Sequence, residues 1–169
     1  MKSRKGPLVG IVIGSETDLP TLKKGVELLK RFGVGIEVEL SSAHRAPEKT
    51  ARYAREAEGR GLRVLIGAAG YANHLAGVLA ANTPLPVIGV PLDTSPLKGL
   101  DSLLSTVQMP AGVPVATVTI GEAGAVNAAV LALQILGTAD PEIRRAIGRY
   151  KEEMAEKVTR RAEEIRNLP

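Results

Sequence analysis

The sequence predicts an α/β protein in which an open parallel sheet lies between two layers of helices. Short apolar runs alternate with helix-like segments, which is the pattern of strands joined by crossover helices. These runs are rich in Val, Ile and Leu, as expected of strands buried on both faces. With 169 residues, of which 44% are apolar and 24% charged, the chain has the length and composition of one globular domain.

Five apolar runs are the expected strands, at residues 8–13, 36–40, 64–66, 87–90 and 115–118. Helical patterns lie between and after them, near residues 19–32, 47–59, 73–82, 99–107 and 122–136. No internal repeat or linker interrupts this alternation. We therefore expect a single domain over 1–169, with a basic tail at 1–6, an α/β core at 7–138 and a C-terminal helix at 140–167.

The C-terminal helix is predicted by its first residues and by its apolar spacing. Asp140 suits the N-cap, Pro141 the first helical position, and Glu142 the first turn. The apolar residues that follow stand mostly three or four positions apart, at Ile143, Ile147, Tyr150, Met154, Val158 and Ile165. Such a narrow stripe on a charged helix indicates packing along one edge only.

The middle of the chain is nearly free of charge. Residues 64–138 hold only four charged side chains, and the helix at 123–136 is apolar nearly all round. A helix on the face of a sheet normally keeps one polar side, so this one needs a second partner or an unusually central place. We expect other copies of the chain to cover it, which predicts a homo-oligomer with extensive interfaces.

Composition excludes several classes of function. The absence of Cys rules out disulfides, iron–sulfur clusters, thiolate zinc and a Cys nucleophile, and two His make a metal site unexpected. Three Tyr, one Phe and no Trp are too few for a platform that stacks nucleic-acid bases. No uninterrupted apolar run reaches the roughly 18–20 residues of a membrane span, and no signal peptide is evident. We expect a cytoplasmic protein without a membrane partner.

The net charge of +4 does not indicate a nucleic-acid partner either. Lys2, Arg4 and Lys5 supply most of the excess, whereas residues 6–139 carry eleven basic and eleven acidic side chains. The excess therefore belongs to a tail and forms no patch on the expected core.

Position in the predicted fold locates the functional site. Open parallel sheets bind ligands at the carboxyl ends of their strands, at the point where the strand order reverses. For the strand order 2-1-3-4-5, that point lies between strands one and three. The loops after the first three strands are 14–18, 41–47 and 67–74, and both histidines, His44 and His74, fall in them.

The first two of these loops carry groups suited to a sugar phosphate. Ser15 stands at a helix start, where free backbone N–H groups favour phosphate, whereas Asp18 suits sugar hydroxyls; simple helix capping is the alternative. Ser42, His44 and Arg45 combine a hydroxyl, a group that titrates near neutrality and a permanent cation.

The third loop offers a close approach to the backbone. Gly67 and Gly70 are typical of a tight turn that lets a ligand approach the main chain. For His74, ligand contact and packing are equally consistent with the sequence. A two-His metal site lacks a third ligand, and Ser-His-Asp hydrolysis lacks its Gly-x-Ser-x-Gly turn.

Five motifs in order resemble the class I N5-carboxyaminoimidazole ribonucleotide mutases of purine biosynthesis. The motifs are Gly14-Ser15-x-x-Asp18, Ser42-Ala43-His44-Arg45-x-Pro47, Ala72-x-His74-Leu75-x-Gly77, Gly99-x-Asp101-Ser102-Leu103 and Val107-Gln108-Met109-Pro110. The similarity runs from about residue 9 to 136. Class II carboxylases, which use free carbon dioxide, are less similar, because Arg45 and the His74-Leu75 pair favour class I.

The resemblance implies a three-layer flavodoxin-like fold, an octamer, and a reaction without metal, ATP or organic cofactor. The carboxylate of N5-carboxyaminoimidazole ribonucleotide would move from N5 to C4. The substrate-binding residues would be Ser15, Asp18, Ser42, Ala43, Arg45, Gly70, His74 and Leu75, with His44 as the acid–base residue. Ser15, Ser42 and Arg45 would hold the phosphate, and Asp18 the ribose hydroxyls.

The chain departs from the family pattern at four places. Thr17 replaces a usual Ser, Ala76 a usual Pro, and Tyr71 and Asn73 replace the small residues Gly and Ala beside the site. Two other functions stay open: direct carboxylation of aminoimidazole ribonucleotide by carbon dioxide, and a non-catalytic oligomer that binds a sugar phosphate. The pairing of His44 with Arg45 argues against the second, since binding alone needs no titrating group.

Overall fold

A computed structural model describes residues 6, 8–166 and 168 of the chain. The chain divides into two compact units, one that ends at Ala132 and one that begins at Leu133. Lys2, Arg4 and Lys5 of the expected basic tail lie outside the described residues. The expected single domain stays a prediction.

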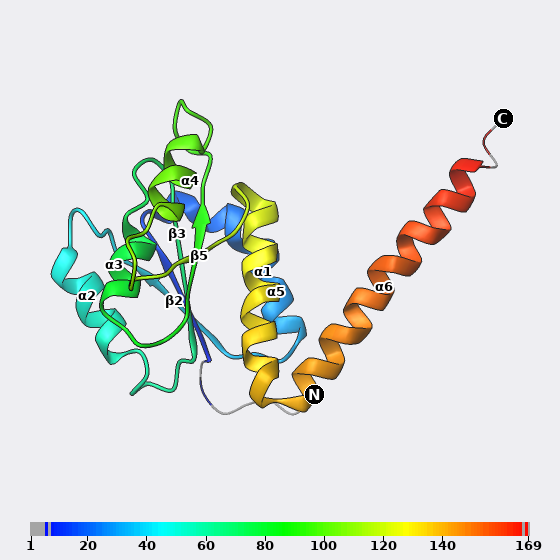
Figure 1. Cartoon of the computed structure of the whole chain (residues 1–169), viewed down its shortest axis with the longest axis horizontal. Helices are drawn as coiled ribbons and strands as arrows, with labels where there is room; N and C mark the ends of the chain where they lie inside the picture. The colour runs from blue at the N-terminus through cyan, green and yellow to red at the C-terminus, as the bar shows by residue number, and fades with distance from the viewer. Residues whose placement is uncertain (1–5, 7, 167, 169) are drawn as a thin grey trace. The chain divides into compact units, whose positions relative to one another are not determined.

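The first unit is built on a five-stranded, all-parallel sheet with the order β2-β1-β3-β4-β5, which confirms the predicted topology. The strands are β1 (Val9–Ile13), β2 (Ile36–Leu40), β3 (Val64–Ala69), β4 (Val87–Pro91) and β5 (Ala116–Thr117). In the register of the sheet, Ile13 at the end of β1 lies beside Leu40 of β2 and Ala68 of β3. The carboxyl ends of these three strands therefore reach one edge together (Figure 1).

The two edge strands differ from the prediction. The expected burial of both faces holds for β1 and β4, whose residues are all buried, but Val38 and Leu40 of β2 are exposed. On β2 the alternate residues are glutamates, and Glu37 pairs with Arg60 at 2.9 Å. At the other edge, regular β5 is only two residues long, although the amide of Val118 still donates to the carbonyl of Gly89 at 3.1 Å.

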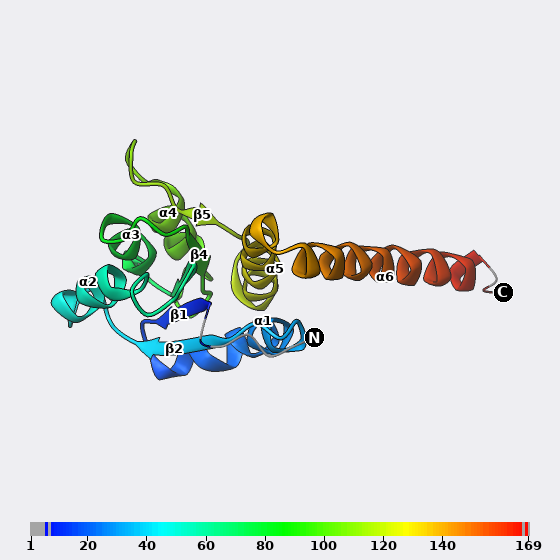
Figure 2. The same cartoon turned by 90° about the horizontal axis from the view of Figure 1, so that it is seen from below.

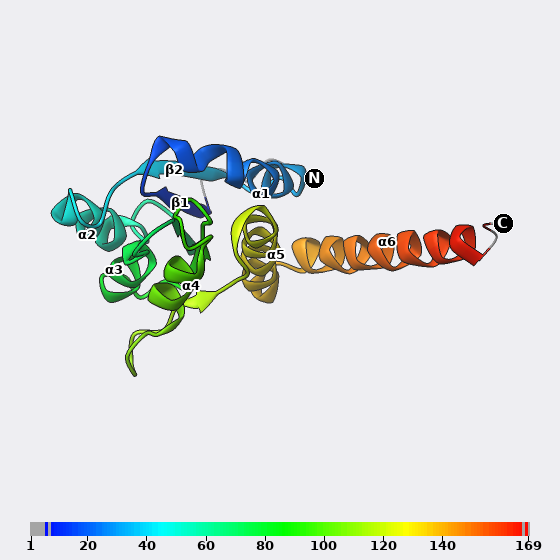
Figure 3. The same cartoon turned by 90° about the horizontal axis from the view of Figure 1, so that it is seen from above.

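In the described part of the chain, seven helical segments connect the strands or follow the last of them. They are η1 (Glu16–Asp18), α1 (Leu19–Arg31), α2 (Pro47–Glu56), α3 (Leu75–Ala81), α4 (Leu100–Val107), α5 (Gly121–Ala139) and α6 (Pro141–Arg166). Helices α2 and α3 cover one face of the sheet, and α1 with the first part of α5 covers the other (Figure 2 and Figure 3). The short turn η1 is the segment that periodicity did not predict.

The two faces of the sheet have separate apolar cores. Tyr53, Leu62, Leu75 and Leu79 belong to a buried cluster on the face that α2 and α3 cover. On the opposite face, residues of the sheet, α1 and α5 surround a small cavity of about 10 Å³: Ile11, Leu22, Gly25, Val26, Leu29, Ile66, Ala125 and Ala129. The sheet is thus enclosed on both faces at its centre.

Helix α5 buries its apolar residues only in part. Ala125, Ala128 and Ala129 are buried, whereas Ala123 is exposed and Val126 is partly buried. Among the described residues, one helix, α5, is long and apolar enough to cross a membrane by length and composition alone, and 44% of that window is buried. Core helices of water-soluble proteins pass the same test, so this property assigns no membrane. The expected interface between copies of the chain stays a prediction.

Helix α6 begins as its first residues predict. The Asp140 carboxylate accepts hydrogen bonds from the backbone amides of Glu142 at 2.8 Å and Ile143 at 3.2 Å. The stripe is buried only near the start of the helix, since Ile143 is buried whereas Met154 and Val158 are exposed. The expected end of the helix at residue 167 lies outside the described residues.

We predict that Gly25→Ala destabilises the first unit, because Gly25 of α1 lies directly against the backbone carbonyl of Ala125 in α5. A Cβ at this position would overlap backbone atoms, which cannot move as a flexible side chain can. The free energy of unfolding, measured by urea denaturation, is expected to fall by about 1–3 kcal/mol. In the control Gly59→Ala the nearest atom to the new Cβ, the Glu56 carbonyl oxygen, is 3.6 Å away. Equal stability of the two variants would contradict the close approach of the helices.

Candidate functional site

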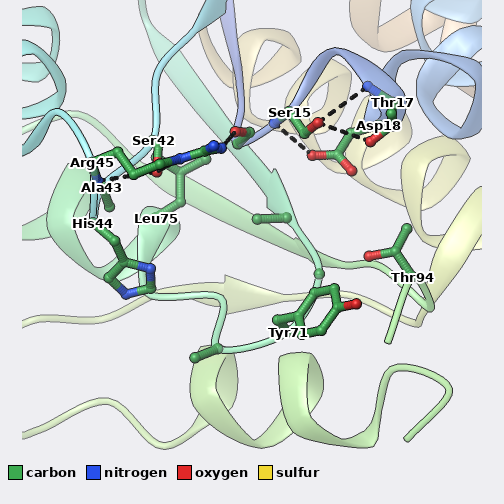
Figure 4. Close-up of a pocket in the computed structure, with 14 residues that line it drawn as sticks. Ser15, Thr17, Asp18, Ser42, Ala43, His44, Arg45, Tyr71, Leu75 and Thr94 are labelled. Atoms are coloured by element: carbon green, nitrogen blue, oxygen red, sulfur yellow. Dashed lines mark hydrogen bonds between the residues drawn. The ribbon is translucent and has the colours of Figure 1, made fainter. Parts of the chain in front are cut away.

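A cavity of about 550 Å³ opens at the edge of the sheet where the central strands end (Figure 4). The loops after β1, β2, β3 and β4 all contribute to its wall. The lining residues are Gly14, Ser15, Thr17, Asp18, Ser42, Ala43, His44, Arg45, Ala69, Gly70, Tyr71, Ala72, Leu75 and Thr94. The cavity therefore lies where the strand order and the first three loops predict it.

The loop after β1 is held by a reciprocal capping box. The Ser15 amide donates to the Asp18 carboxylate at 2.9 Å, and the Ser15 hydroxyl accepts from the Thr17 amide at 3.4 Å and shares a hydrogen bond of 2.8 Å with the Thr17 hydroxyl. The residues that cap this short helix therefore also line the cavity. Because Asp18 is only 4% exposed, burial raises the pKa of its carboxyl above the ordinary 3.8, against the lowering effect of the Ser15 and Gly14 amides.

The loop after β2 directs Arg45 toward the loop after β1. The Arg45 amide donates to the Ser42 hydroxyl at 3.2 Å, and the Arg45 Nε donates to the same oxygen at 3.4 Å. The end of the guanidinium donates to the Gly14 carbonyl at 3.5 Å (Figure 4). One cation and the hydroxyls of Ser15 and Ser42 therefore line one part of the cavity, a set of groups that suits a phosphate.

The two histidines meet, although 30 positions separate them in the chain. His44 Nε2 and His74 Nδ1 are 2.8 Å apart, and the rings stand nearly perpendicular at 87°. Such a bond needs one nitrogen with a proton and one without, so two neutral rings or one neutral and one charged ring can form it. His44 lines the cavity, whereas His74 does not and touches the site through His44. The other predicted site residues all line the cavity.

The loop after β3 approaches the loop after β4 so closely that Gly70 has no room for a side chain. A Cβ at Gly70 would overlap the hydroxyl of Thr94. Thr94 is the lining residue that the sequence did not predict. Its position just after the fourth strand could have predicted it as a lining residue, because the carboxyl end of β4 adjoins that of β3.

Tyr71 and Asn73, the two replacements in this loop, have different surroundings. Tyr71 lines the cavity, is 59% exposed, and has a left-handed backbone with φ of +54°. Asn73 is fully buried and does not line the cavity. Its side-chain Nδ2 donates to the Val90 carbonyl at 3.3 Å, and its backbone amide donates to the Ser105 hydroxyl at 2.8 Å. Only Tyr71 therefore changes the shape of the cavity itself.

The remaining sequence motifs are not in the cavity wall. The segments 99–103 and 107–110 belong to α4 and its flanks, and Ser102 donates to the carbonyls of Leu92 and Gly99 at 2.8 and 3.0 Å. These bonds hold the loop after β4. Over residues 6, 8–166 and 168, no group of three or more Asp, Glu or His side chains is arranged to bind a metal ion.

Comparison with protein families matches residues 8–157 to the AIR carboxylase family. A protein named N5-carboxyaminoimidazole ribonucleotide mutase from Pyrococcus horikoshii is 52% identical over 168 residues, which cover 99% of this chain and 93% of the relative. Its namesake from Thermotoga maritima is 51% identical and covers 96% and 94% of the two chains. The crystal structure of Treponema denticola PurE has a TM-score of 0.81 at 30% identity, covering 91% of this chain and 95% of that one.

We predict that the stability of the folded chain depends on pH through Asp18. A carboxyl whose pKa rises on folding stabilises the folded chain when it is protonated. This contribution to stability is fully present below pH 3.8 and is lost as the pH rises through the raised pKa of the folded state. Asp18→Asn has no such ionisation. The free energy of unfolding of Asp18→Asn, minus that of the unsubstituted chain, should therefore increase as the pH rises from about 4 to about 7. Urea denaturation over this range measures the difference; two parallel curves would show that folding leaves the Asp18 carboxyl unperturbed.

Proposed function

The chain belongs to the AIR carboxylase family, as its motifs predicted, and we propose that it is an N5-carboxyaminoimidazole ribonucleotide mutase. Its reaction would move the carboxylate of the substrate from N5 to C4 and yield 4-carboxyaminoimidazole ribonucleotide. Two kinds of observation support this. Relatives of that name share about half of their residues with nearly the whole chain. The observation that carries the proposal is that His44 and Arg45 line one cavity, in which a proton-transferring group stands beside an anion-binding one.

The contacts in the cavity suggest how the substrate would lie. The phosphate would be bound by the Ser15 and Ser42 hydroxyls and by the Arg45 guanidinium, which contacts Ser42 and the Gly14 carbonyl next to Ser15. The ribose hydroxyls would donate to the Asp18 carboxylate. The aminoimidazole would then extend toward His44, between Ala43, Gly70 and Leu75.

The proposed chemistry needs one group that gives a proton and later removes one. When N5 gains a proton, the bond between N5 and the carboxylate carbon breaks, its electron pair stays on nitrogen, and carbon dioxide is released inside the site. The enamine-like C4 then forms a bond to that carbon dioxide, and a base removes the proton from C4. His44 can supply the first proton and accept the last, which restores it for the next cycle.

His74 would keep His44 ready for this exchange. A ring nitrogen of His74 bonded to His44 Nε2 at 2.8 Å fixes the orientation of the His44 ring and selects its tautomer. This assigns His74 a positioning role through His44, in place of the direct substrate contact that the family resemblance implied.

Two further parts of the proposal concern assembly and location. We propose a homo-octamer in the cytoplasm that needs no metal or organic cofactor. The exposed apolar residues of β2 and α4, which include Val38, Leu40, Leu100 and Leu104, support an assembly of copies, since such surfaces are normally covered. Light scattering of the purified chain measures the number of copies; a monomer would contradict the assembly.

The second candidate function is direct carboxylation of aminoimidazole ribonucleotide, which the description of the family as AIR carboxylase favours. One assay separates the two. Each carboxylated isomer is incubated with the protein, with and without added bicarbonate, and the other isomer is measured. The mutase interconverts the isomers without added bicarbonate. Strict dependence on bicarbonate would favour the carboxylase, and no turnover of either isomer would favour a protein that only binds a sugar phosphate.

We predict that His44→Asn abolishes interconversion and leaves ribonucleotide binding largely intact. Asn occupies similar space but cannot transfer protons near neutrality, so the rate should fall by about 10³-fold or more. Rates are measured with both isomers, and binding of aminoimidazole ribonucleotide is measured by calorimetry.

The matched control for this variant is Arg45→Ala at the neighbouring position. Removing a charged donor to the phosphate should weaken ribonucleotide binding by about tenfold or more. If His44→Asn keeps its full rate, the acid–base role assigned to His44 is wrong.

A further inference from the structure

Tyr71 is the one Phe, Tyr or Trp among the residues that line the cavity. It follows Gly70 and precedes Ala72, so its ring is the only large side chain that this part of the loop presents. The ring is 59% exposed, although a Tyr side chain usually gains stability by burial. A large, amphipathic side chain left open at a cavity is placed to contact what the cavity binds.

The ring lies at the end of the cavity where the reaction would occur. In Figure 4, Ser15 and Arg45 lie along one side, and His44 and Tyr71 lie on the other, with Thr94 beyond Tyr71. A ribonucleotide whose phosphate is bound by Arg45 would thus extend its imidazole toward the space between His44 and Tyr71. This placement rests on the proposed function.

We propose that Tyr71 covers the bound imidazole ring and slows the escape of carbon dioxide from the site. Between the breaking of the bond to N5 and the formation of the bond to C4, carbon dioxide is attached to nothing. It has no charge and no hydrogen-bond donor by which Arg45 or the serines could hold it. A physical barrier must therefore keep it near C4. Where the family usually has Gly, this chain places an aromatic ring, and a ring lying over the base adds to that barrier. Carbon dioxide that escapes leaves aminoimidazole ribonucleotide as a by-product.

The backbone at Tyr71 allows the ring to be removed without disturbing the loop. Among the described residues, Tyr71 and Lys98 are the two non-glycine residues with a left-handed backbone, with φ of +54° and +50°. Glycine adopts this conformation without a steric penalty, so Gly suits both positions. Lys98 does not line the cavity, and Lys98→Gly is therefore a matched control for the backbone change.

The experiment measures how much carbon dioxide escapes during each conversion. The N5-carboxylated isomer, labelled with ¹³C in its carboxylate, is converted in a pool of unlabelled bicarbonate with carbonic anhydrase present. Mass spectrometry gives the fraction of product that has lost the label, together with the amount of aminoimidazole ribonucleotide, after subtraction of an enzyme-free sample. Because it is a ratio within one reaction, this fraction does not depend on how much of the protein is active. A loss of folded or active protein would therefore leave this fraction unchanged.

Tyr71→Gly is expected to raise the lost fraction by about tenfold, whereas Tyr71→Phe and Lys98→Gly keep the original value. The melting temperatures of all variants should stay within about 4 °C of the unsubstituted chain. An unchanged fraction in Tyr71→Gly, or an equal rise in Tyr71→Phe, overturns the role of the ring as a cover. If the unsubstituted chain does not interconvert the isomers, the proposed function itself fails, and this inference fails with it.

Discussion

The parallel register of β1 with its two neighbours is the constraint on which the site depends. Because Ile13 lies beside Leu40 and Ala68, the loops that leave these strands start at the same height along the sheet. Ladder hydrogen bonds and the burial of every β1 side chain hold that register, because a shift by one residue would exchange the side chains that pack against the helices on the two faces. The residues that line the cavity come from loops that are far apart in the sequence. The register of the strands brings these loops together.

Hydrogen bonds between neighbouring loops then set the direction of the charges. Arg45 contacts both Ser42 and the Gly14 carbonyl, so the cation is directed across the cavity toward the loop after β1. The nearby Asp18 carboxylate is buried and is compensated by a backbone amide. A cation near the cavity and a partly compensated anion behind it produce a site with one end suited to phosphate and one suited to hydroxyls.

Close packing decides which side chains reach the cavity. Gly70 and Thr94 leave no space between the loops after β3 and β4, and Asn73 is held inside by the Val90 carbonyl. Tyr71, between them in sequence, is left as the residue that faces outward. Of the two polar residues, Asn73 is therefore buried against the end of β4, and Tyr71 borders the cavity.

Much of the fold and of the site could be predicted from the sequence by itself. The alternation of elements and the loops that carry Ser15, Ser42 and His44 follow from apolar periodicity and from the rule that parallel strands bind ligands at their carboxyl ends. The strand order came with the fold that the family motifs implied. These properties are local, or they follow from topology, and so they are visible in a single chain.

Only the tertiary structure decided the contacts between distant segments. The bond between His44 and His74, the contact of Gly70 with Thr94, and the burial of Asn73 beside an exposed Tyr71 each join parts of the chain with no common pattern. Sequence spacing carries no information on which way a loop side chain turns. That direction is set by the packing of neighbouring loops and helices, which exists only once the sheet has formed.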